Sequence, residues 1–459
     1  IEEYTKEYGT DHLYMSDTFI EMKPTFPAET RLQNYAEMGE GVYKAIAAAD
    51  PDGVWIMMGW PFLVLPDYWG EEEIEAMFSK VPQEKAILLD LAVESTPIWK
   101  RSKAFRERQW ISSVIHNYGE NTMTYGILPT VADVHQKVLA DPDHGNHVGA
   151  GITPEGIEQN SVVYELQTDA IWSKKPIDLA EWLPAYCRQR YGACPPAMEQ
   201  AWKILSTESV YGADMDFSAG EQDLYAAKPC IAKHPGLDYR PSGLAELQPE
   251  PLLKAVDLFI SCSDELGGSD LYRRDLVDLV KQYVVLNDRL LVPQIKAAHE
   301  AGDTAKRDSL IEQFMQLIGD LDRLLGTRPE YRLSHWINDA RAKATTPEEA
   351  DLYEHNARQI ITRWGGNLTD YAFKEWSGLL NGYYGIRWRM FFDRLQNDKA
   401  FDAADVKANI EAWEMSWINS TAPVKENTGG DEIAIARELL ERYRKQALSK
   451  TPVPTKEQK

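Results

Sequence analysis

The sequence predicts an α/β domain followed by an all-α domain. Over residues 1–175, short apolar runs rich in β-branched and aromatic residues alternate with amphipathic segments, which predicts a parallel sheet covered by helices. Over residues 176–447, apolar residues recur at helical spacing almost without interruption. Residues 448–459, with two prolines and three lysines, are expected to form a disordered tail. A chain of 459 residues is long enough for two or three domains.

Five runs in the first part have the length of buried β-strands. None shows the alternation of apolar and polar residues that a half-solvated strand has, so both faces of each strand should be covered. The amphipathic segments Arg31–Ala49 and Glu71–Lys80 lie between them as connecting helices. The predicted strands are Leu13–Ile20, Val54–Trp60, Ile87–Leu91, Trp110–His116 and Val148–Ile152.

The number of strands leaves the architecture of this sheet open. A closed (β/α)8 barrel of the TIM type needs eight parallel strands, so five predict either an open sheet or the C-terminal part of such a barrel. Ile1 follows neither a Met nor a signal peptide, which indicates a processed or truncated chain. We therefore favour the barrel, with its upstream strands absent from this chain and supplied by an upstream segment or a second chain.

Capping signals define the helices of the second part. Asp178 is placed as the N-cap of a helix over Leu179–Arg190, and Gly192 should end it. The segment Thr346–Glu349 combines a capping box with a Pro in the first turn, and it should open a helix that extends to about Trp364.

The rest of the second part contains further helical segments and no repeat of fixed period, so we expect a helical domain rather than a solenoid. Pro293 lies within the predicted helix Leu271–Ala298 and should kink or break it. The other predicted helices are Pro251–Glu265, Thr304–Leu325, Pro329–Ala344, Tyr371–Gln396, Ala403–Asn419 and Glu432–Ala447.

The formal net charge of −23 argues against two classes of partner, because it repels both nucleic-acid phosphates and anionic lipid headgroups. No apolar run approaches the roughly 18 residues of a membrane-spanning helix, so we expect no membrane insertion. Four cysteines are too few for a disulfide-built scaffold, and no Cys/His cluster has metal-ligand spacing. We therefore expect neither a metal nor an organic cofactor.

Two glutamates follow predicted strands at positions typical of catalytic groups. Glu21 comes directly after the first strand, and Glu155 follows the fifth, between a Pro and a Gly that enforce a turn. Barrel active sites are built at such carboxyl ends, and a pair of carboxylates is the minimum equipment for glycoside hydrolysis. Spacing alone is a weak signal, because the chain holds 72 acidic residues and an acid at a strand end is more often a helix N-cap.

Aromatic and hydrogen-bonding residues at the same strand ends strengthen the carbohydrate interpretation. Trp60 closes the second predicted strand, and His116 and Asn117 close the fourth. Sugars bind by stacking their apolar faces on aromatic rings while their hydroxyls pair with polar side chains. Most aromatic residues of any chain belong to the core, and Trp55 and Trp110, which lie within their strands, are assigned to packing.

Ordered motifs over most of the chain resemble the α-N-acetylglucosaminidases of glycoside hydrolase family 89. The resemblance runs from about Asp17 to Arg389. Its pieces are Asp17-Thr18-Phe19-Ile20-Glu21-Met22, Val54-Trp55 with Gly59-Trp60, Leu89-Asp90-Leu91 with Glu94-Ser95, His116-Asn117-Tyr118-Gly119, Pro154-Glu155-Gly156-Ile157 with Gln159-Asn160, Trp364-Gly365 with Asn367 and Asp370-Tyr371, and Tyr383-Tyr384 with Arg387-Trp388-Arg389.

The resemblance implies a retaining exo-hydrolase that releases terminal α-linked N-acetylglucosamine from mucin-type or heparan-type glycans through a glycosyl-enzyme intermediate. By this similarity Glu21 matches the general acid/base and Glu155 the nucleophile. The implied fold is a (β/α)8 barrel followed by a helical domain that helps to form the sugar pocket. The family's location implies a secreted, periplasmic or lysosomal protein.

The resemblance also implies substrate-binding residues. Trp60 matches a pocket tryptophan of the barrel, and Trp364 and Tyr371 match pocket residues of the helical domain. Leu368 stands where some relatives have Ile. Ile20 departs from the Asn or His that many relatives have before the acid/base, and the loop after Trp364 is shorter than in some members. These differences bear on substrate preference more than on the chemistry.

Stereochemistry supports a two-glutamate mechanism independently. In an α-glucosaminide the leaving oxygen at C1 and the acetamido group at C2 are cis, so the acetamide cannot attack the back of C1 and the enzyme must supply the nucleophile. We expect the two carboxyl groups to lie about 5–5.5 Å apart, the retaining geometry. The negative charge favours neutral glycans over sulfated ones. Two alternatives remain: a hydrolase of another α-hexosaminide, and a non-catalytic carbohydrate-binding or scaffold protein.

Overall fold

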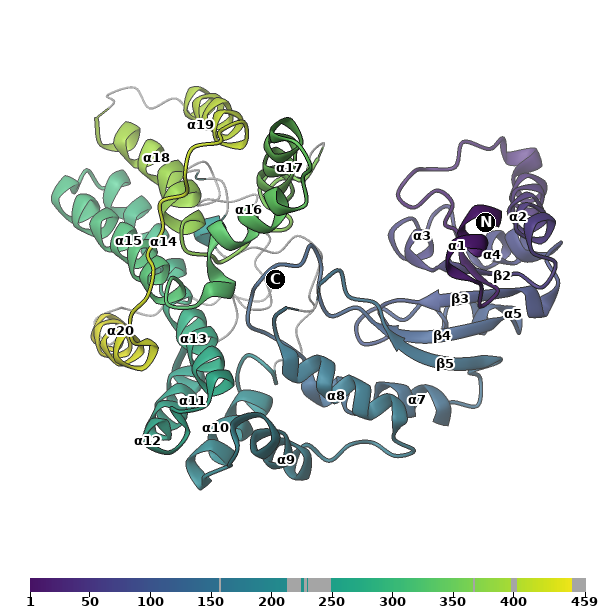
Figure 1. Cartoon of the computed structure of the whole chain (residues 1–459), viewed down its shortest axis with the longest axis horizontal. Helices are drawn as coiled ribbons and strands as arrows, with labels where there is room; N and C mark the ends of the chain where they lie inside the picture. Colours follow the sequence, from purple (N-terminus) through teal and green to yellow (C-terminus); the bar gives the residue numbers. More distant parts are fainter. Residues whose placement is uncertain are drawn as a thin grey trace. The chain divides into compact units, whose positions relative to one another are not determined.

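A computed structural model describes residues 1–156, 158–212, 224–226, 229, 249–365, 368–397 and 403–447. These residues form two compact units (Figure 1). The first comprises Ile1–Asn117, Leu128–Glu155 and Ser161–Leu179, and the second comprises Tyr118–Ile127, Gly156–Asn160 and the chain from Ala180 onward. The predicted tail, residues 448–459, lies outside the described residues. Within the described part, no helix combines the length and the hydropathy needed to cross a bilayer.

The first unit is built on a parallel sheet whose five strands lie side by side in chain order (Figure 1). Each strand pairs with the next, for example Met15 with Ile56 and Val114 with Ile152. The expectation of a parallel sheet is therefore confirmed, and each strand overlaps a predicted run. The strands are β1 Leu13–Met15, β2 Val54–Met58, β3 Ala86–Asp90, β4 Gln109–Val114 and β5 His147–Ile152.

β1 ends earlier than the sequence predicts, at Met15 rather than Ile20. The chain leaves the sheet at Asp17, whose Oδ1 accepts a hydrogen bond from the backbone N–H of Met58 at 2.8 Å. Phe19 then adopts a left-handed φ of 53°, which extended strand geometry does not allow. The residues after β1 therefore form a loop.

Helices connect the strands, as the alternating pattern predicts. The longest, α2, packs against α4 and contacts β2, while α8 contacts β5. α8 and the short α6 and α7 were not among the predicted helices. The helices of this unit are α1 Glu2–Tyr8, η1 Ala28–Thr30, α2 Arg31–Ala49, α3 Trp60–Val64, α4 Glu71–Phe78, η2 Gln83–Lys85, α5 Lys103–Arg106, α6 Leu128–Val131, α7 Val134–Ala140 and α8 Ser161–Trp172.

The core of the first unit contains Trp55 and Trp110, and both are fully buried. The ring of Trp110 stacks on that of Trp99 at 5.5 Å, and the indole N–H of Trp55 donates to the backbone oxygen of Ser16 at 2.6 Å. A buried Trp is satisfied when its N–H finds an acceptor. Their assignment to packing is confirmed.

The second unit is helical throughout most of its described length. α13 contacts α11, α15 and α20, and α15 also packs against α14 and α18. Its helices are α9 Leu179–Tyr191, α10 Pro196–Thr207, η3 Leu224–Ala226, α11 Pro249–Ser261, α12 Ser263–Leu266, α13 Asp270–Val285, α14 Asp288–Glu300, α15 Thr304–Leu325, η5 Pro329–Tyr331, α16 Leu333–Ala342, α17 Pro347–Ile360, the π-helix η6 Leu380–Tyr384, α18 Gly385–Asn397, α19 Ala403–Ile418 and α20 Glu432–Ala447.

Of the predicted helix-end signals, the stop at Gly192 is confirmed and the capping box at Thr346 is confirmed in part. Gly192 has a φ of 93°, and its N–H donates to the carbonyl of Arg188 at the end of α9. The Thr346 hydroxyl accepts the N–H of Glu349 at 3.2 Å at the start of α17. The Glu349 carboxylate, however, accepts the N–H of Thr345 rather than that of Thr346, so the capping box is only half formed.

Three predictions for this unit were wrong. The segment predicted as Leu271–Ala298 breaks at Leu286 and Asn287, and Pro293 lies inside α14 rather than at the break. α10 was not predicted at all. Most of Tyr371–Leu379 is not helical, because several of its backbone N–H groups donate to side chains rather than to carbonyls of a preceding helical turn. The N–H of Lys374 donates to the Tyr384 hydroxyl, that of Glu375 to the Thr122 hydroxyl, and that of Gly378 to the Asp322 carboxylate.

The contact between α2 and α4 yields a matched pair of variants. A Cβ at Gly39 would lie 1.7 Å from the backbone oxygen of Met77, whereas one at Gly41, on the same helix, would meet nothing within 4 Å. We expect Gly39→Ala to force the helices apart and to destabilise the protein by about 1–3 kcal/mol or more. Gly41→Ala should stabilise it by up to about 1 kcal/mol, since alanine favours helix. Urea unfolding of both variants measures the difference, and equal effects would contradict this packing.

Candidate functional site

The parallel sheet brings the loops that follow its strands to one edge. Because all five strands run in the same direction, their carboxyl ends lie at that edge. The loops there carry Glu21 after β1, Trp60 after β2, Glu94 after β3, His116 after β4 and Glu155 after β5. Four of these five residues are predicted site residues, and the fifth, Glu94, had no role assigned from the sequence.

The first two loops meet through a hydrogen bond between predicted site residues. The indole N–H of Trp60 donates to Glu21 Oε1 at 3.0 Å. Glu21 is exposed, while Trp60 is half-buried and begins α3. An N–H donor directed at a carboxyl oxygen orients the carboxyl group. The structure therefore brings the predicted acid/base together with the predicted pocket tryptophan of the barrel.

The positions of these two residues depend on their neighbours in the chain. Asp17 ties the loop after β1 to β2 through the N–H of Met58, and burial raises the pKa of Asp17. Gly59 donates its N–H to the carbonyl of Leu89, and a Cβ at Gly59 would approach that oxygen to 2.8 Å. Glycine is therefore required for β2 to end beside β3 and start the short helix at Trp60.

His116 and Asn117 lie in a tight, buried turn after β4. His116 has a left-handed φ of 54°, and the N–H of Asn117 donates to the carbonyl of Ile115 at 2.5 Å. Burial lowers the pKa of His116 to about 3, so its ring is neutral near neutral pH. The ring lies edge-on to Tyr164, with 5.5 Å between the centroids. His116 can therefore act through hydrogen bonding rather than through charge.

Glu155 lies in the loop after β5, and its backbone is bound to the turn after β4. Its N–H donates to the carbonyl of Asn117 at 3.3 Å, and two residues earlier Thr153 donates its N–H to Val114 at 3.0 Å. The Thr153 hydroxyl also donates to the carbonyl of Leu91 at 3.2 Å. The Glu155 residue itself is exposed. The predicted nucleophile is thus accessible to a ligand and held at its backbone.

Two buried carboxyl groups after β3 are the residues whose role sequence reasoning missed. Asp90 Oδ2 accepts the N–H groups of Ile98 and Trp99, both at 2.8 Å. Glu94 Oε1 accepts those of Ile115 and His116. Burial is the main reason that the pKa of each carboxyl rises to about 7. The available signal was Asp90 within the otherwise apolar stretch 86–93 and Glu94 directly after it.

The other three predicted site residues belong to the second unit. Trp364 and Tyr371 contact each other edge to face, with 5.2 Å between the ring centroids. Leu368 lies in the short loop between them, where its N–H donates to the carbonyl of Gly365 at 3.0 Å. Trp364 is 37% exposed and Leu368 45% exposed, so both leave part of their apolar surface accessible. The structure brings these three together.

A cluster of buried ion pairs binds the loop that leads to Tyr371. Arg387 is fully buried and donates to Asp370 at 2.8 Å and to Glu414 at 3.0 Å, and also to the carbonyl of Ala226. Asp370, directly before Tyr371, has a left-handed φ of 56°. Removal of Arg387 would take the shared guanidinium away from two buried carboxyl groups, of which Glu414 also lies 3.9 Å from Arg363.

The loop after β4 also approaches Tyr371 within the second unit. Gly119 has a φ of 63°, and a Cβ there would lie 2.5 Å from the backbone oxygen of Tyr371. The next residue, Glu120, pairs with the buried ammonium of Lys374 at 3.3 Å. The motif residue Gly119 is therefore explained by a close backbone approach.

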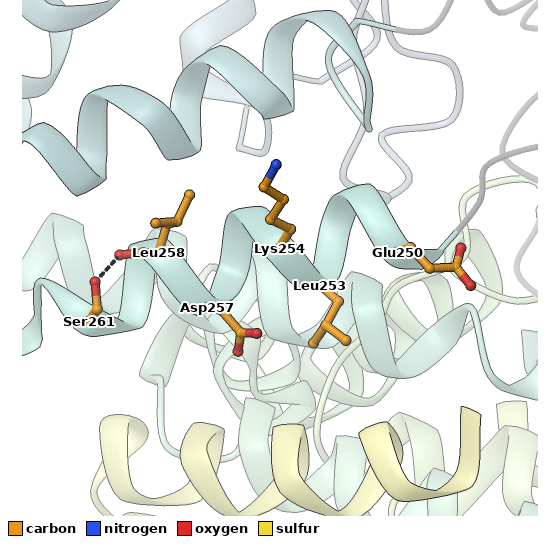
Figure 2. A pocket seen from close by; sticks show the side chains of 6 residues that line it. All are labelled: Glu250, Leu253, Lys254, Asp257, Leu258 and Ser261. Carbon is orange, nitrogen blue, oxygen red and sulfur yellow. Dashed lines mark hydrogen bonds between the residues drawn. The ribbon is translucent and has the colours of Figure 1, made fainter. Parts of the chain in front are cut away.

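Two other features of the described residues are unrelated to these groups. His12, Asp50 and Asp52 could together offer three metal ligands, but they lie at the amino ends of β1 and β2, opposite the edge described above, and His12 already pairs with Asp50 at 2.7 Å. A pocket of about 380 Å³ lies along α11 (Figure 2). Its lining residues are Glu250, Leu253, Lys254, Asp257, Leu258 and Ser261.

Comparison with known proteins identifies the relatives of both units. A family model of the alpha-N-acetylglucosaminidase (NAGLU) tim-barrel domain matches residues 1–174, and the model of the alpha-N-acetylglucosaminidase (NAGLU) C-terminal domain matches residues 182–442. Human alpha-N-acetylglucosaminidase is 32% identical over 455 residues, which cover 96% of this chain and 59% of the human protein.

Solved structures agree with these matches. A family 89 glycoside hydrolase from Clostridium perfringens, in complex with 2-acetamido-1,2-dideoxynojirmycin, superposes with a TM-score of 0.84 at 26% identity, covering 96% of this chain and 50% of that chain. A variant of the Clostridium enzyme in complex with its substrate GlcNAc-alpha-1,4-galactose gives a TM-score of 0.83 at 25% identity, over 96% and 49% of the two chains. The chain thus spans little more than half the length of these relatives.

The buried Glu94 carboxyl leads to a prediction for stability. Its pKa is about 7 in the folded protein against 4.5 for an ordinary Glu, so the folded state binds the extra proton between these values. The stability linked to this proton is fully present below about pH 4.5 and is lost as the pH rises through about 7. The melting temperature of the wild type relative to Glu94→Gln should therefore be higher at pH 5 than at pH 8.

Burial also lowers the pKa values of His116, His135 and His147 to between about 3 and 4, so these residues make the stability of the folded state rise with pH. This trend opposes that of Glu94. Comparing the wild type with Glu94→Gln at each pH removes it, because both proteins contain the three histidines. A difference in melting temperature that does not change with pH would contradict the raised pKa of Glu94.

The Arg387 cluster leads to a prediction for the second unit. Arg387→Ala should lower the free energy of unfolding by about 3–5 kcal/mol, because it leaves Asp370 and Glu414 buried without their partner. Arg389→Ala, at an exposed position on the same helix, should change it by less than about 0.5 kcal/mol. Denaturant unfolding of both variants measures the contrast. Similar values for the two would show that the cluster contributes little.

Proposed function

The chain belongs to the α-N-acetylglucosaminidase family, family 89 of the glycoside hydrolases, and on that basis we propose that it releases terminal α-linked N-acetylglucosamine from glycans. The observation that carries the proposal is the contact between Trp60 and Glu21 at the sheet edge to which Glu155 also belongs. Both glutamates are exposed, so a sugar can reach them. The domain models support assigning residues 1–175 to the catalytic barrel and 176–447 to the helical domain.

Glu155 acts as the nucleophile and Glu21 as the general acid/base. In the first step Glu155 attacks C1 opposite the leaving oxygen, the C1–O bond breaks, and the leaving oxygen takes the proton of Glu21. In the second step water attacks C1, Glu21 takes its proton, and the bond between C1 and Glu155 breaks. Two inversions retain the α configuration. The cis acetamide supports this assignment, because it cannot replace the enzymic nucleophile.

Each unit carries proposed substrate-binding residues. In the first unit Trp60, His116 and Asn117 lie in loops at the same sheet edge as the two glutamates. In the second unit the binding residues are Trp364, Leu368 and Tyr371, and the exposure of Trp364 and Leu368 supports this role. Aromatic faces and a neutral histidine suit an uncharged sugar with many hydroxyls.

Neutral mucin-type glycans fit this chain better than sulfated ones, because its net charge of −23 repels polyanions. The Clostridium relative, whose structure holds its substrate GlcNAc-alpha-1,4-galactose, supports a neutral disaccharide of this kind. Neither step above requires a metal or an organic cofactor. On the family resemblance we also propose a secreted, periplasmic or lysosomal location.

Variants of the two glutamates test the mechanism. Glu155→Ala should reduce kcat roughly 10³-fold or more, and added azide should restore turnover with formation of the β-glycosyl azide. Glu21→Ala should reduce kcat about 10²–10⁴-fold on a poor leaving group and much less on a 2,4-dinitrophenyl glycoside, with azide yielding the α-glycosyl azide. Product configuration by NMR distinguishes the two roles.

Glu29→Gln, at an exposed residue of η1, serves as the control and should keep wild-type activity. A panel of aryl α-hexosaminides shows whether N-acetylglucosamine is the preferred sugar. Activity of Glu155→Ala within tenfold of the wild type would refute the mechanism. Binding of the disaccharide without any turnover by the wild type would favour a carbohydrate-binding protein instead.

A further inference from the structure

The loop after β3 carries a carboxylate that the two-glutamate mechanism does not use. Glu94 Oε1 accepts the backbone N–H of Ile115 at 3.1 Å and that of His116 at 3.0 Å. Its other oxygen, Oε2, is buried and accepts no hydrogen bond from any residue that the structure describes. The two backbone N–H groups therefore fix the position of the Glu94 carboxyl group. The carboxyl group in turn fixes the backbone of Ile115 and His116.

The turn that Glu94 holds is strained. His116 has a φ of 54°, a left-handed conformation that residues with a Cβ rarely adopt, and the N–H of Asn117 bonds only two residues back, to Ile115. Such a conformation persists only where the surroundings impose it. A carboxylate oxygen bound to two successive N–H groups at the start of the turn is an interaction of this kind.

The same turn fixes the backbone of Glu155. The carbonyl of Asn117 accepts the Glu155 N–H at 3.3 Å, directly after the strained residue. A continuous path of hydrogen bonds and peptide units therefore runs from Glu94 through His116 and Asn117 to the predicted nucleophile.

The loop that carries Glu94 is itself fixed. Asp90, at the end of β3, accepts the N–H groups of Ile98 and Trp99, beyond Glu94 in the chain. The N–H of Val93 donates to the carbonyl of Ser113 at 3.1 Å. Glu94 therefore projects from a loop that is bound on both sides, which makes its carboxylate a rigid support rather than a mobile one.

We propose that Glu94 is a positioning residue for Glu155, which holds the strained turn at His116 and Asn117 and through it the backbone of the nucleophile. The inference rests on the proposed function, because it takes Glu155 as the group that attacks C1. Displacement of a reacting group by about 1 Å can cost about 10²-fold in rate. Because the turn that Glu94 holds carries His116 and Asn117 as well as the backbone contact of Glu155, its loss should lower kcat more than it raises KM.

The test compares Glu94→Ala, Glu94→Asp and Glu94→Gln. Glu94→Ala should lower kcat about 10²-fold and raise KM by a smaller factor, since it removes both hydrogen bonds. Glu94→Gln retains an oxygen at the same place and should keep kcat within about fivefold of the wild type. Glu94→Asp, which is one methylene shorter, should fall between them, and it decides the question if Glu94→Ala does not fold. Glu72→Ala, at an exposed residue of α4, is the control.

Hydrogen exchange provides a readout that does not need activity. In Glu94→Ala the amides of peptides covering 114–117 and 153–156 should exchange faster than in the wild type, and Glu94→Gln should restore protection. Unchanged exchange at 153–156, or unchanged kcat in Glu94→Ala and Glu94→Asp, would overturn the positioning role. The proposed function would still stand in that case if Glu155→Ala is inactive and rescued by azide, so the two failures can be told apart.

Discussion

Parallel pairing of five buried strands in chain order is the constraint on which the first unit depends. Each strand bonds to its neighbours on the backbone, and the connections return the chain to the same starting edge. Every loop after a strand must therefore lie at the opposite edge. Residues far apart in the chain, such as Glu21, His116 and Glu155, share that edge for this reason alone.

Polar groups buried beneath the candidate site residues give those residues defined positions. Asp90 and Glu94 satisfy backbone N–H groups of loops that carry no regular secondary structure, and Arg387 pairs with Glu414 and with Asp370, the residue directly before Tyr371. Removing such groups from water is costly and is tolerated where each finds partners of matching geometry. Both units therefore hold exposed candidate site residues on loops that buried polar groups stabilise.

Prediction from the sequence succeeded where the signal is local. Strands of unbroken apolar character and helices with a long periodic face, such as Thr304–Leu325, were located closely. It failed at Tyr371–Leu379, whose apolar spacing is compatible with a helix but whose N–H groups bond to side chains of Thr122 and Asp322. It failed again at Pro293, which lies inside α14, while the helix breaks before it at Leu286 and Asn287.

The sequence by itself determined the parallel sheet, the helical second part, and the glutamates and aromatic residues that follow the strands. These features depend on hydrophobic periodicity and on residues adjacent in the chain, which a reader of the sequence can see. Only the tertiary structure decided that Trp60 donates to Glu21 and that Glu94 supports the turn at His116. A backbone N–H has no side-chain identity, so no sequence pattern shows which distant carboxylate will bind it; that depends on how the strands align.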